Sequence, residues 1–202
     1  MIYDFAIPTL EFTPQGVLSA YQCGIFPMAD EVTGEIEWYL PDPRTILPFE
    51  CLHVSRRLAR TIRSGKFEVR FNTSFERVMR ACADRAEGSW ISDEFVGMYS
   101  TLHRLGFAHS VESWRDGSLA GGLYGVAIGG AFMGESMFHW ETDASKVALV
   151  ALVERLQERG FRLLDAQLPS AHLSSLGAIQ IPAIKYLSLL QKAIALDCDF
   201  DD

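Results

Sequence analysis

The stretch that decides the fold is residues 118–138, SLAGGLYGVAIGGAFMGESMF. Apolar, aromatic and small residues fill both halves, and a Gly-Gly pair separates them, as in a tight turn between antiparallel strands. We therefore predict strands over 118–127 and 131–138. A preceding strand is predicted over residues 107–114, because an Asp116-Gly117 turn follows them. The centre of the chain is thus predicted to be an antiparallel meander.

Helical patterns flank this meander on both sides. Apolar residues at helical spacing, with capping residues and terminal glycines, predict helices. The predicted helices cover residues 52–64, 75–82, 95–105, 144–159 and 183–196, with a helical turn around His172. Shorter strands are predicted at 66–71, 161–165 and 178–181. Helices, then a meander, then helix-strand-helix make the chain α+β with a mainly antiparallel central sheet.

The first 50 residues differ in composition from the rest of the chain, since they hold six of the eight prolines. Proline removes backbone donors and breaks helices, so long regular elements are not expected there. One short helix is predicted from Pro14, with Thr13 as its cap and Gly24 as its end. We expect a small irregular N-terminal domain over 1–48 and a larger domain over 49–202.

Composition narrows the class of protein. The chain has 202 residues, 49% of them hydrophobic, which excludes global disorder. Its 18 basic and 26 acidic residues give a net charge of -8, so any nucleic-acid contact requires a local basic face. No two of its 4 cysteines are spaced as closely as paired zinc ligands are, and no apolar segment approaches the length of a membrane span. We expect a cytoplasmic monomer that does not bind membranes.

Two polar groups follow apolar strand residues and are candidates for chemistry. Glu135 lies among Phe132, Met133 and Phe138, where burial would raise its pKa. Asp165-Ala166-Gln167 ends a short apolar strand, and strand ends commonly carry functional residues. The alternatives stay open at this point. Glu135 could be a solvated edge residue, and the Asp-x-Gln segment could merely cap a turn.

A third candidate is a basic helix face. Arg56, Arg60 and Arg63 recur at i, i+4 and i+7 and therefore share one side of a helix. Few acidic residues interrupt the segment, and the chain as a whole is acidic. The pattern favours a phosphate-binding face over an ordinary solvated helix surface.

Nine short motifs, in this order and spacing, resemble those of one family. They are Ala20-Tyr21-Gln22-Cys23-Gly24-Ile25-Phe26-Pro27, Pro41-Asp42-Pro43-Arg44, Leu102-His103-Arg104-Leu105-Gly106, His109-Ser110-Val111-Glu112, Gly121-Gly122-Leu123-Tyr124-Gly125, Gly134-Glu135-Ser136-Met137-Phe138, Ala144-Ser145-Lys146, Asp165-Ala166-Gln167 and Ser175-Leu176-Gly177. The sequence resembles the bacterial leucyl/phenylalanyl-tRNA–protein transferases from about Gly16 to Leu190. One departure is Met28, where the family has Trp after Phe-Pro.

The resemblance implies a small N-terminal domain against a larger domain similar to the GNAT acyltransferases. It implies transfer of Leu or Phe, and sometimes Met, from aminoacyl-tRNA to the N-terminal Arg or Lys of an acceptor protein. The product would be marked for degradation by the N-end rule. No metal or nucleotide cofactor is implied.

The resemblance also implies roles for individual residues. Gln167 would contact the reacting groups, Asp165 would support it electrostatically, and Glu135 would orient a substrate. The residues expected to bind the aminoacyl end are Leu123, Phe132, Ser136, Met28 and Trp90. Arg56, Arg60 and Arg63 would bind acceptor-stem phosphates of the tRNA.

Two other functions compete with this one. A GNAT-like N-acyltransferase with another acyl donor, such as acyl-CoA, would need a pyrophosphate-binding loop at a helix N-terminus, and none is found. A tRNA-binding module whose catalysis has lapsed would not need the intact Asp165 and Gln167. Substitution of Gln167 separates an enzyme from a binder, because only an enzyme would lose activity while retaining affinity for tRNA.

Overall fold

The computed structural model describes residues 10–30, 33–84 and 88–201 and confirms the α+β class with a mainly antiparallel central sheet. The strands are β1 (Phe26–Ala29), β2 (Ile36–Tyr39), β3 (Arg44–Ile46), β4 (Glu68–Phe71), β5 (Ala108–Arg115), β6 (Ser118–Ile128), β7 (Ala131–His139), β8 (Leu163–Gln167) and β9 (Ile179–Ile181). The helices are α1 (Pro14–Gln22), α2 (Arg56–Arg63), α3 (Phe75–Ala83), α4 (Asp93–Arg104), α5 (Ala144–Glu158), α6 (Ala171–Ser175) and α7 (Ala183–Ile194), with a 3-10 turn at Phe49–Cys51.

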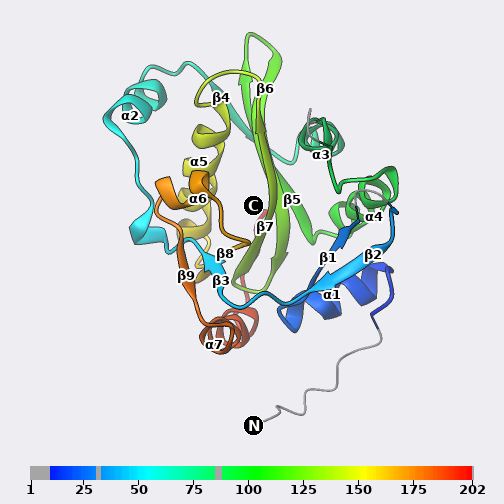
Figure 1. Ribbon diagram of the computed structural model, residues 1–202. Coiled ribbons are helices and arrows are strands. Elements are labelled where there is room, and N and C mark those ends of the chain that lie inside the picture. Colours follow the sequence, from blue (N-terminus) through cyan, green and yellow to red (C-terminus); the bar gives the residue numbers. More distant parts are fainter. Residues whose placement is uncertain (1–9, 31–32, 85–87, 202) are drawn as a thin grey trace.

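One large sheet organises the molecule (Figure 1). Its seven strands lie in the order β4-β5-β6-β7-β8-β3-β9. The predicted meander forms β5, β6 and β7, and every neighbouring pair in the sheet is antiparallel except β7 and β8. Register is fixed by alternating buried residues, as where Leu123 faces Val111 on one side and Met137 on the other.

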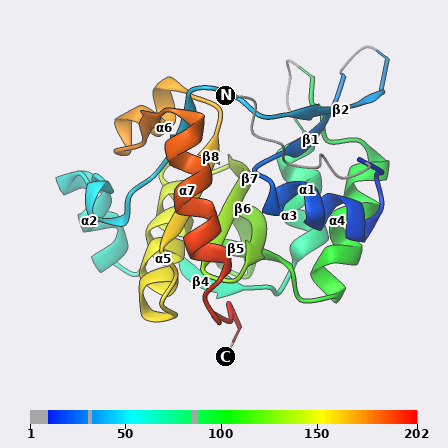
Figure 2. The same cartoon turned by 90° about the horizontal axis from the view of Figure 1, so that it is seen from below.

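Helices cover both faces of this sheet. Helix α5 packs on one face, whereas α3 and α4 lie against the other (Figure 1). Helices α1 and α7 lie next to each other at one end of the molecule, as the view from below shows (Figure 2). Burial of apolar side chains between these layers supplies the main driving force for folding. Among the described residues, no helix combines the length and apolar character that a membrane span requires.

The N-terminal region is more regular than predicted. Strands β1 and β2 pair as a two-stranded antiparallel sheet, and β3 joins the large sheet between β8 and β9. These strands have three or four residues each. Strands this short show no recognisable periodic pattern in the sequence, and pairing with other strands decides their conformation. The domain boundary after residue 48 stays a prediction.

The start of α2 differs most from the prediction. Helix α2 begins at Arg56 rather than at residue 52, because the Ser55 side chain caps it by accepting a hydrogen bond from Leu58 N at 3.2 Å. Helix α5 begins at Ala144, as predicted, and the side chain of the preceding Asp143 makes no capping bond. Its carboxylate instead accepts a hydrogen bond from Arg57 at 2.7 Å, which ties α2 to the start of α5.

The sheet is interrupted where β7 leaves β8. Pairing between these parallel strands ends at Met133 and Asp165. On the other side of β7, Tyr124 faces Ser136 while Gly125 faces Gly134, so Glu135 is the extra residue of a β-bulge. Bulges re-aim side chains and are frequent next to active sites. Glu135 and the end of β8 therefore lie where the regular sheet is interrupted.

Candidate active site

A pocket of about 490 Å³ opens where β7 and β8 part. Its apolar wall is formed by side chains of Leu47, Leu123, Met137, Leu149, Leu152 and Leu164. Its polar lining includes Glu135, Ser136, His139, Ser145, Asp165, Gln167, Ser170 and His172. A concave, mostly apolar site with a few convergent polar groups is typical of small-ligand binding in enzymes.

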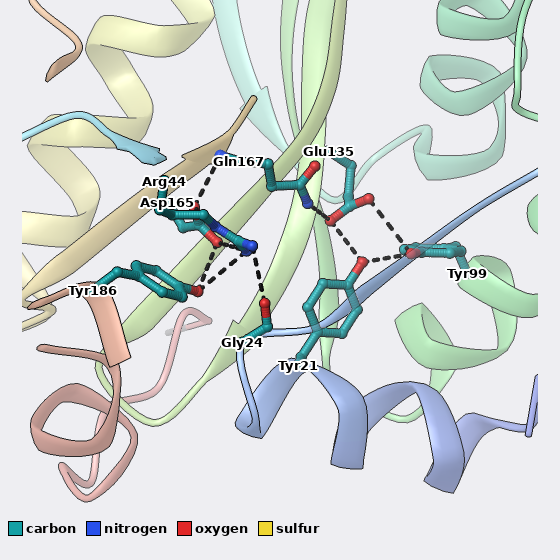
Figure 3. A network of polar contacts seen from close by, with 8 residues as sticks. All are labelled: Tyr21, Gly24, Arg44, Tyr99, Glu135, Asp165, Gln167 and Tyr186. Carbon is teal, nitrogen blue, oxygen red and sulfur yellow. Dashed lines mark hydrogen bonds and ion pairs between the residues drawn. The ribbon is translucent and has the colours of Figure 1, made fainter. Parts of the chain in front are cut away.

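Glu135 is the polar residue with the most unusual environment in this pocket. Its Oε1 accepts hydrogen bonds from the Tyr21 hydroxyl at 2.6 Å and from Gln167 Nε2 at 2.7 Å (Figure 3). Within the described part of the chain, its Oε2 has only the Tyr99 hydroxyl, at 3.5 Å. Burial raises the pKa of Glu135 to about 7, and the nearby Asp165 charge adds to this, although the donors from Tyr21 and Gln167 oppose it.

The two tyrosines form a short chain behind this carboxylate. Their hydroxyl oxygens are 2.5 Å apart, and both side chains are fully buried. Burial and the Glu135 charge raise the pKa of Tyr21 and of Tyr99 well above the ordinary value. Both hydroxyls therefore stay protonated and act as hydrogen-bond donors, while Glu135 exchanges its proton near neutral pH.

Asp165 is held very differently. Arg44 donates to its two oxygens through Nε at 2.9 Å and Nη2 at 2.5 Å, and neither side chain is exposed. The Tyr186 hydroxyl donates to Oδ2 at 2.8 Å. Burial opposes the charge on Arg44, but the adjacent carboxylate raises its pKa above the ordinary value. The pair is a buried, bidentate ion pair with further hydrogen bonds, the arrangement in which burying two charges is tolerated.

Gln167 connects these two carboxylates. Its backbone N–H donates to Asp165 Oδ1 at 2.9 Å, and its side chain donates to Glu135. Its φ is 59°, in the left-handed region that non-glycine residues seldom adopt. This conformation lies at the end of β8, and both Asp165 and Gln167 line the pocket.

The structure brings most of the predicted substrate-binding residues to one place. Met28, Trp90, Leu123 and Ser136 all line the pocket, although they come from four separate segments of the chain. Phe132 does not. It is fully buried and packs against Phe200, with ring centroids 5.5 Å apart. The expectation that Phe132 lines the pocket is therefore not met. Phe132 pairs with the pocket-lining Leu164 across β7 and β8, but it lies in the core cluster that also holds Phe200.

The basic face is present as predicted. Arg56, Arg60 and Arg63 are exposed on α2, which lies beside α5 (Figure 1). Within the described ranges none of the three has a carboxylate within 4.0 Å, whereas Arg57 on the same helix pairs with Asp143. An exposed cluster of unpaired guanidinium groups is suited to phosphate.

Sequence reasoning missed part of the site. Arg44, Tyr21, Tyr99 and Tyr186 complete its polar network, and four leucines outside the predicted set, Leu47, Leu149, Leu152 and Leu164, complete its apolar wall. Two signals were available, because Tyr21 and Arg44 lie within motifs that carry the family resemblance. Tyr99 and Tyr186 look like ordinary apolar positions on helices, so their hydroxyl contacts could not be foreseen.

The arrangement can bind an apolar side chain and handle one proton beside it. The leucine wall removes an apolar group from water, Glu135 holds or releases a proton near neutral pH, and the Gln167 amide donates hydrogen bonds. A search of the described residues finds no group of three or more His, Cys, Asp or Glu side chains placed to hold a metal ion.

Comparison with known proteins agrees with this geometry. The family model for leucyl/phenylalanyl-tRNA protein transferase matches residues 46–191, and the model for the N-terminal domain of that protein matches residues 11–42. A protein named leucyl/phenylalanyl-tRNA–protein transferase from Gloeobacter violaceus is 52% identical over 188 residues, covering 93% of this chain and 97% of its own. One of the same name from Herpetosiphon aurantiacus is 52% identical over 193 residues, covering 95% and 100%.

Among solved structures, a ribosomal-protein-alanine N-acetyltransferase from Brucella melitensis aligns with a TM-score of 0.40 and 14% identity, over 52% of this chain and 82% of that one. The family assignment rests on the sequence matches. They cover almost the whole chain, and the family-model match over 46–191 spans the positions of Glu135, Asp165 and Gln167. The chain belongs to the leucyl/phenylalanyl-tRNA protein transferase family and is an aminoacyltransferase.

Proposed function

We propose that this aminoacyltransferase moves Leu or Phe, and sometimes Met, from aminoacyl-tRNA to the N-terminal Arg or Lys of acceptor proteins and so marks them for N-end-rule degradation. The observation that carries the proposal is the position of Glu135 and Gln167 beside a leucine-lined pocket in a member of this family. The pocket suits a branched or aromatic apolar side chain. Such a pocket separates side chains by only about 1–3 kcal/mol per methylene, which fits a donor range of several amino acids.

The reaction needs one bond formed, one broken and one proton moved. The acceptor amine attacks the ester carbonyl carbon of the donor, a C–N bond forms, and the C–O bond to the terminal ribose breaks. The amine loses a proton and the ribose hydroxyl gains one, so the step balances without any cofactor. The ester is already activated, and the enzyme mainly orients the two reactants and manages the proton.

Glu135 is the residue suited to carry that proton. Among the described residues its Oε2 has only a long contact to Tyr99, so this oxygen can accept a proton from the amine and return it to the leaving ribose oxygen. Gln167 has two N–H donors on its side-chain amide, and one of them bonds to Glu135. The other can stabilise the negative charge that develops on the carbonyl oxygen.

The donor tRNA requires a surface outside the pocket. Arg56, Arg60 and Arg63 provide a basic face in a protein whose net charge is -8, and we assign acceptor-stem phosphates to it. We assign the stacking of the terminal base to Met28 and Trp90 at the pocket. A cytoplasmic monomer fits the substrates and the absence of a disulfide among the four cysteines, Cys23, Cys51, Cys82 and Cys198.

The test is transfer of radiolabelled Leu or Phe from charged tRNA to short peptides. Peptides that begin with Arg or Lys should be labelled, and matched peptides that begin with Ala, Asp or Glu should not. Labelling of acidic N-termini would keep the chemistry and refute the proposed acceptor. An intact ester on bound tRNA with no labelled peptide would refute the transfer itself and favour a lapsed tRNA-binding module.

A further inference from the structure

Arg44 is the most completely enclosed cation of the site. It lies on β3, and its side chain is wholly buried. The guanidinium carbon lies 4.8 Å from the ring centroid of Phe26 and 4.4 Å from that of Tyr186. Its Nη1 also donates to the backbone oxygen of Gly24 at 2.9 Å (Figure 3). Arg44 therefore joins the chain just before β1 to the sheet that carries the site.

The hydrogen bonds to Asp165 fill its acceptor sites. A carboxylate has about four lone-pair sites. Four donors occupy them, namely Arg44 Nε, Arg44 Nη2, the Tyr186 hydroxyl and the Gln167 backbone N–H. A further hydrogen-bond donor, such as one from a substrate, would have to displace one of these four. Asp165 is thus a fully hydrogen-bonded carboxylate that orients its neighbours.

The neighbour that depends on this orientation is Gln167. Its left-handed backbone, with φ at 59°, is held by the N–H bond to Asp165 Oδ1. With that backbone fixed, its side-chain nitrogen reaches Glu135 at 2.7 Å. A continuous series of contacts therefore runs from Arg44 through Asp165 and Gln167 to Glu135 (Figure 3).

We propose that Arg44 is a positioning residue for aminoacyl transfer: its bidentate grip on Asp165 sets the left-handed turn that directs the Gln167 amide to Glu135. The same guanidinium fixes Gly24 and Phe26, and so the strand that places Met28 at the pocket. This inference rests on the proposed function for its catalytic meaning. Its geometric meaning, that the Gln167–Glu135 bond depends on Arg44, is independent of the substrate.

The experiment compares Arg44→Lys with Arg155→Lys. Lysine keeps the charge of Arg44 but loses the two-pronged fork. Arg155 is a matched control, because it also lies over aromatic rings, Phe71 at 4.4 Å and Phe200 at 5.2 Å, and donates to a backbone oxygen, but does not line the pocket. Two quantities are measured on folded protein: the single-turnover transfer rate at saturating charged tRNA, and the pKa of Glu135 by carboxyl ¹³C NMR.

For Arg44→Lys we expect transfer about 10–100-fold slower with tRNA affinity within about twofold of the parent, since misplacement by a fraction of an ångström affects the chemical step. We also expect the pKa of Glu135 to rise by about 0.5–1 unit, since losing the Gln167 donor disfavours the charged form. Arg155→Lys should change neither quantity. An unchanged rate and an unchanged Glu135 pKa in Arg44→Lys would overturn the proposal.

A milder variant keeps the test decisive if Arg44→Lys does not fold. Tyr186→Phe retains the ring over Arg44 and removes one donor to Asp165. It should slow transfer about threefold and move the Glu135 pKa upward. No change in either would overturn the inference. If the parent protein transfers neither Leu nor Phe, the proposed function fails, and the NMR measurement still decides whether Arg44 positions Gln167.

Discussion

Two carboxylates on strands of the same sheet, Glu112 on β5 and Glu135 on β7, differ sharply in their surroundings. Glu112 is fully buried and receives five hydrogen bonds. The donors are Thr73 N and Ser74 N, each at 3.0 Å, Ser110 Oγ at 2.7 Å, Trp114 Nε1 at 3.2 Å, and the Thr73 hydroxyl. Glu135 has two close donors, both on one oxygen, and faces a pocket.

The contrast separates structural from chemical carboxylates. Glu112 ties the backbone before α3 to the central sheet, and every oxygen is occupied, so it has nothing left to offer a substrate. Burial raises the pKa of Glu135 to about 7, because its few donors do not fully offset the loss of water around the charged form. The two acids thus differ in the number and placement of their donors and in whether they face the pocket.

The strongest test of this contrast is Glu135→Gln. An amide cannot accept the proton of the attacking amine, so we expect transfer to fall by about 10²–10⁴-fold, the range typical of losing a general base. The fold and the affinity for charged tRNA should persist, because Gln can keep hydrogen bonds to Tyr21 and Gln167. Single-turnover transfer beside a tRNA filter-binding assay measures both. A rate within threefold of the parent would remove Glu135 from the proton path.

The matched change, Glu112→Gln, should have the opposite character. The new NH₂ group would face existing donors, leaving buried polar groups unpaired, and we expect a loss of about 2–4 kcal/mol in the free energy of unfolding. Urea titration followed by circular dichroism measures it. The folded fraction should transfer Leu at the parent rate. A stable but inactive Glu112→Gln protein would show that donor count does not separate the two roles.

Much of the sheet could be predicted from the sequence, and the reason is its periodicity. The meander over β5, β6 and β7 has long apolar segments separated by Asp-Gly and Gly-Gly turns, and such local signals determine strands directly. Strands β1, β2 and β3 were missed, because three or four residues give no measurable period. Their conformation depends on partners far along the chain.

The acidic residues of the site could be predicted from the sequence, whereas their hydrogen-bond partners could not. Glu135 and Asp165 stand out as polar residues after apolar strands, and the resemblance gave them roles. The bulge that re-aims Glu135 and the φ of 59° at Gln167 arise from tertiary pairing, which no local pattern encodes. Arg44 illustrates the limit: it lies 121 residues from Asp165 in the sequence, and only the sheet brings them together.

A third prediction uses the pH dependence of stability. The folded-state pKa of Glu135, about 7, lies above its ordinary value of 4.5, so the folded protein binds this proton more tightly than the unfolded chain. The stabilisation is fully present below pH 4.5 and is lost as pH rises through 7. At pH 8 we therefore expect Glu135→Gln to be more stable than the parent by about 1–3 kcal/mol, with the gap closing near pH 5. Urea titrations at several pH values measure it, and a gap independent of pH would contradict the raised pKa.

The smallest expected effect applies the same comparison, paired against unpaired, to the arginines of α2. Arg57 has its partner in Asp143, whereas Arg60 is exposed and has no carboxylate within 4.0 Å in the described part of the chain. If Arg60 binds phosphate, Arg60→Gln should weaken tRNA binding about two- to fourfold and lower the salt slope of log affinity by about 0.7–0.9, the value for one phosphate contact. Arg57→Gln should leave the slope nearly unchanged, because its charge is already matched within the protein. Filter binding of charged tRNA at several salt concentrations measures both. Equal salt slopes for the two variants would mean that Arg57 binds RNA although it pairs with Asp143. The basic face would then include Arg57.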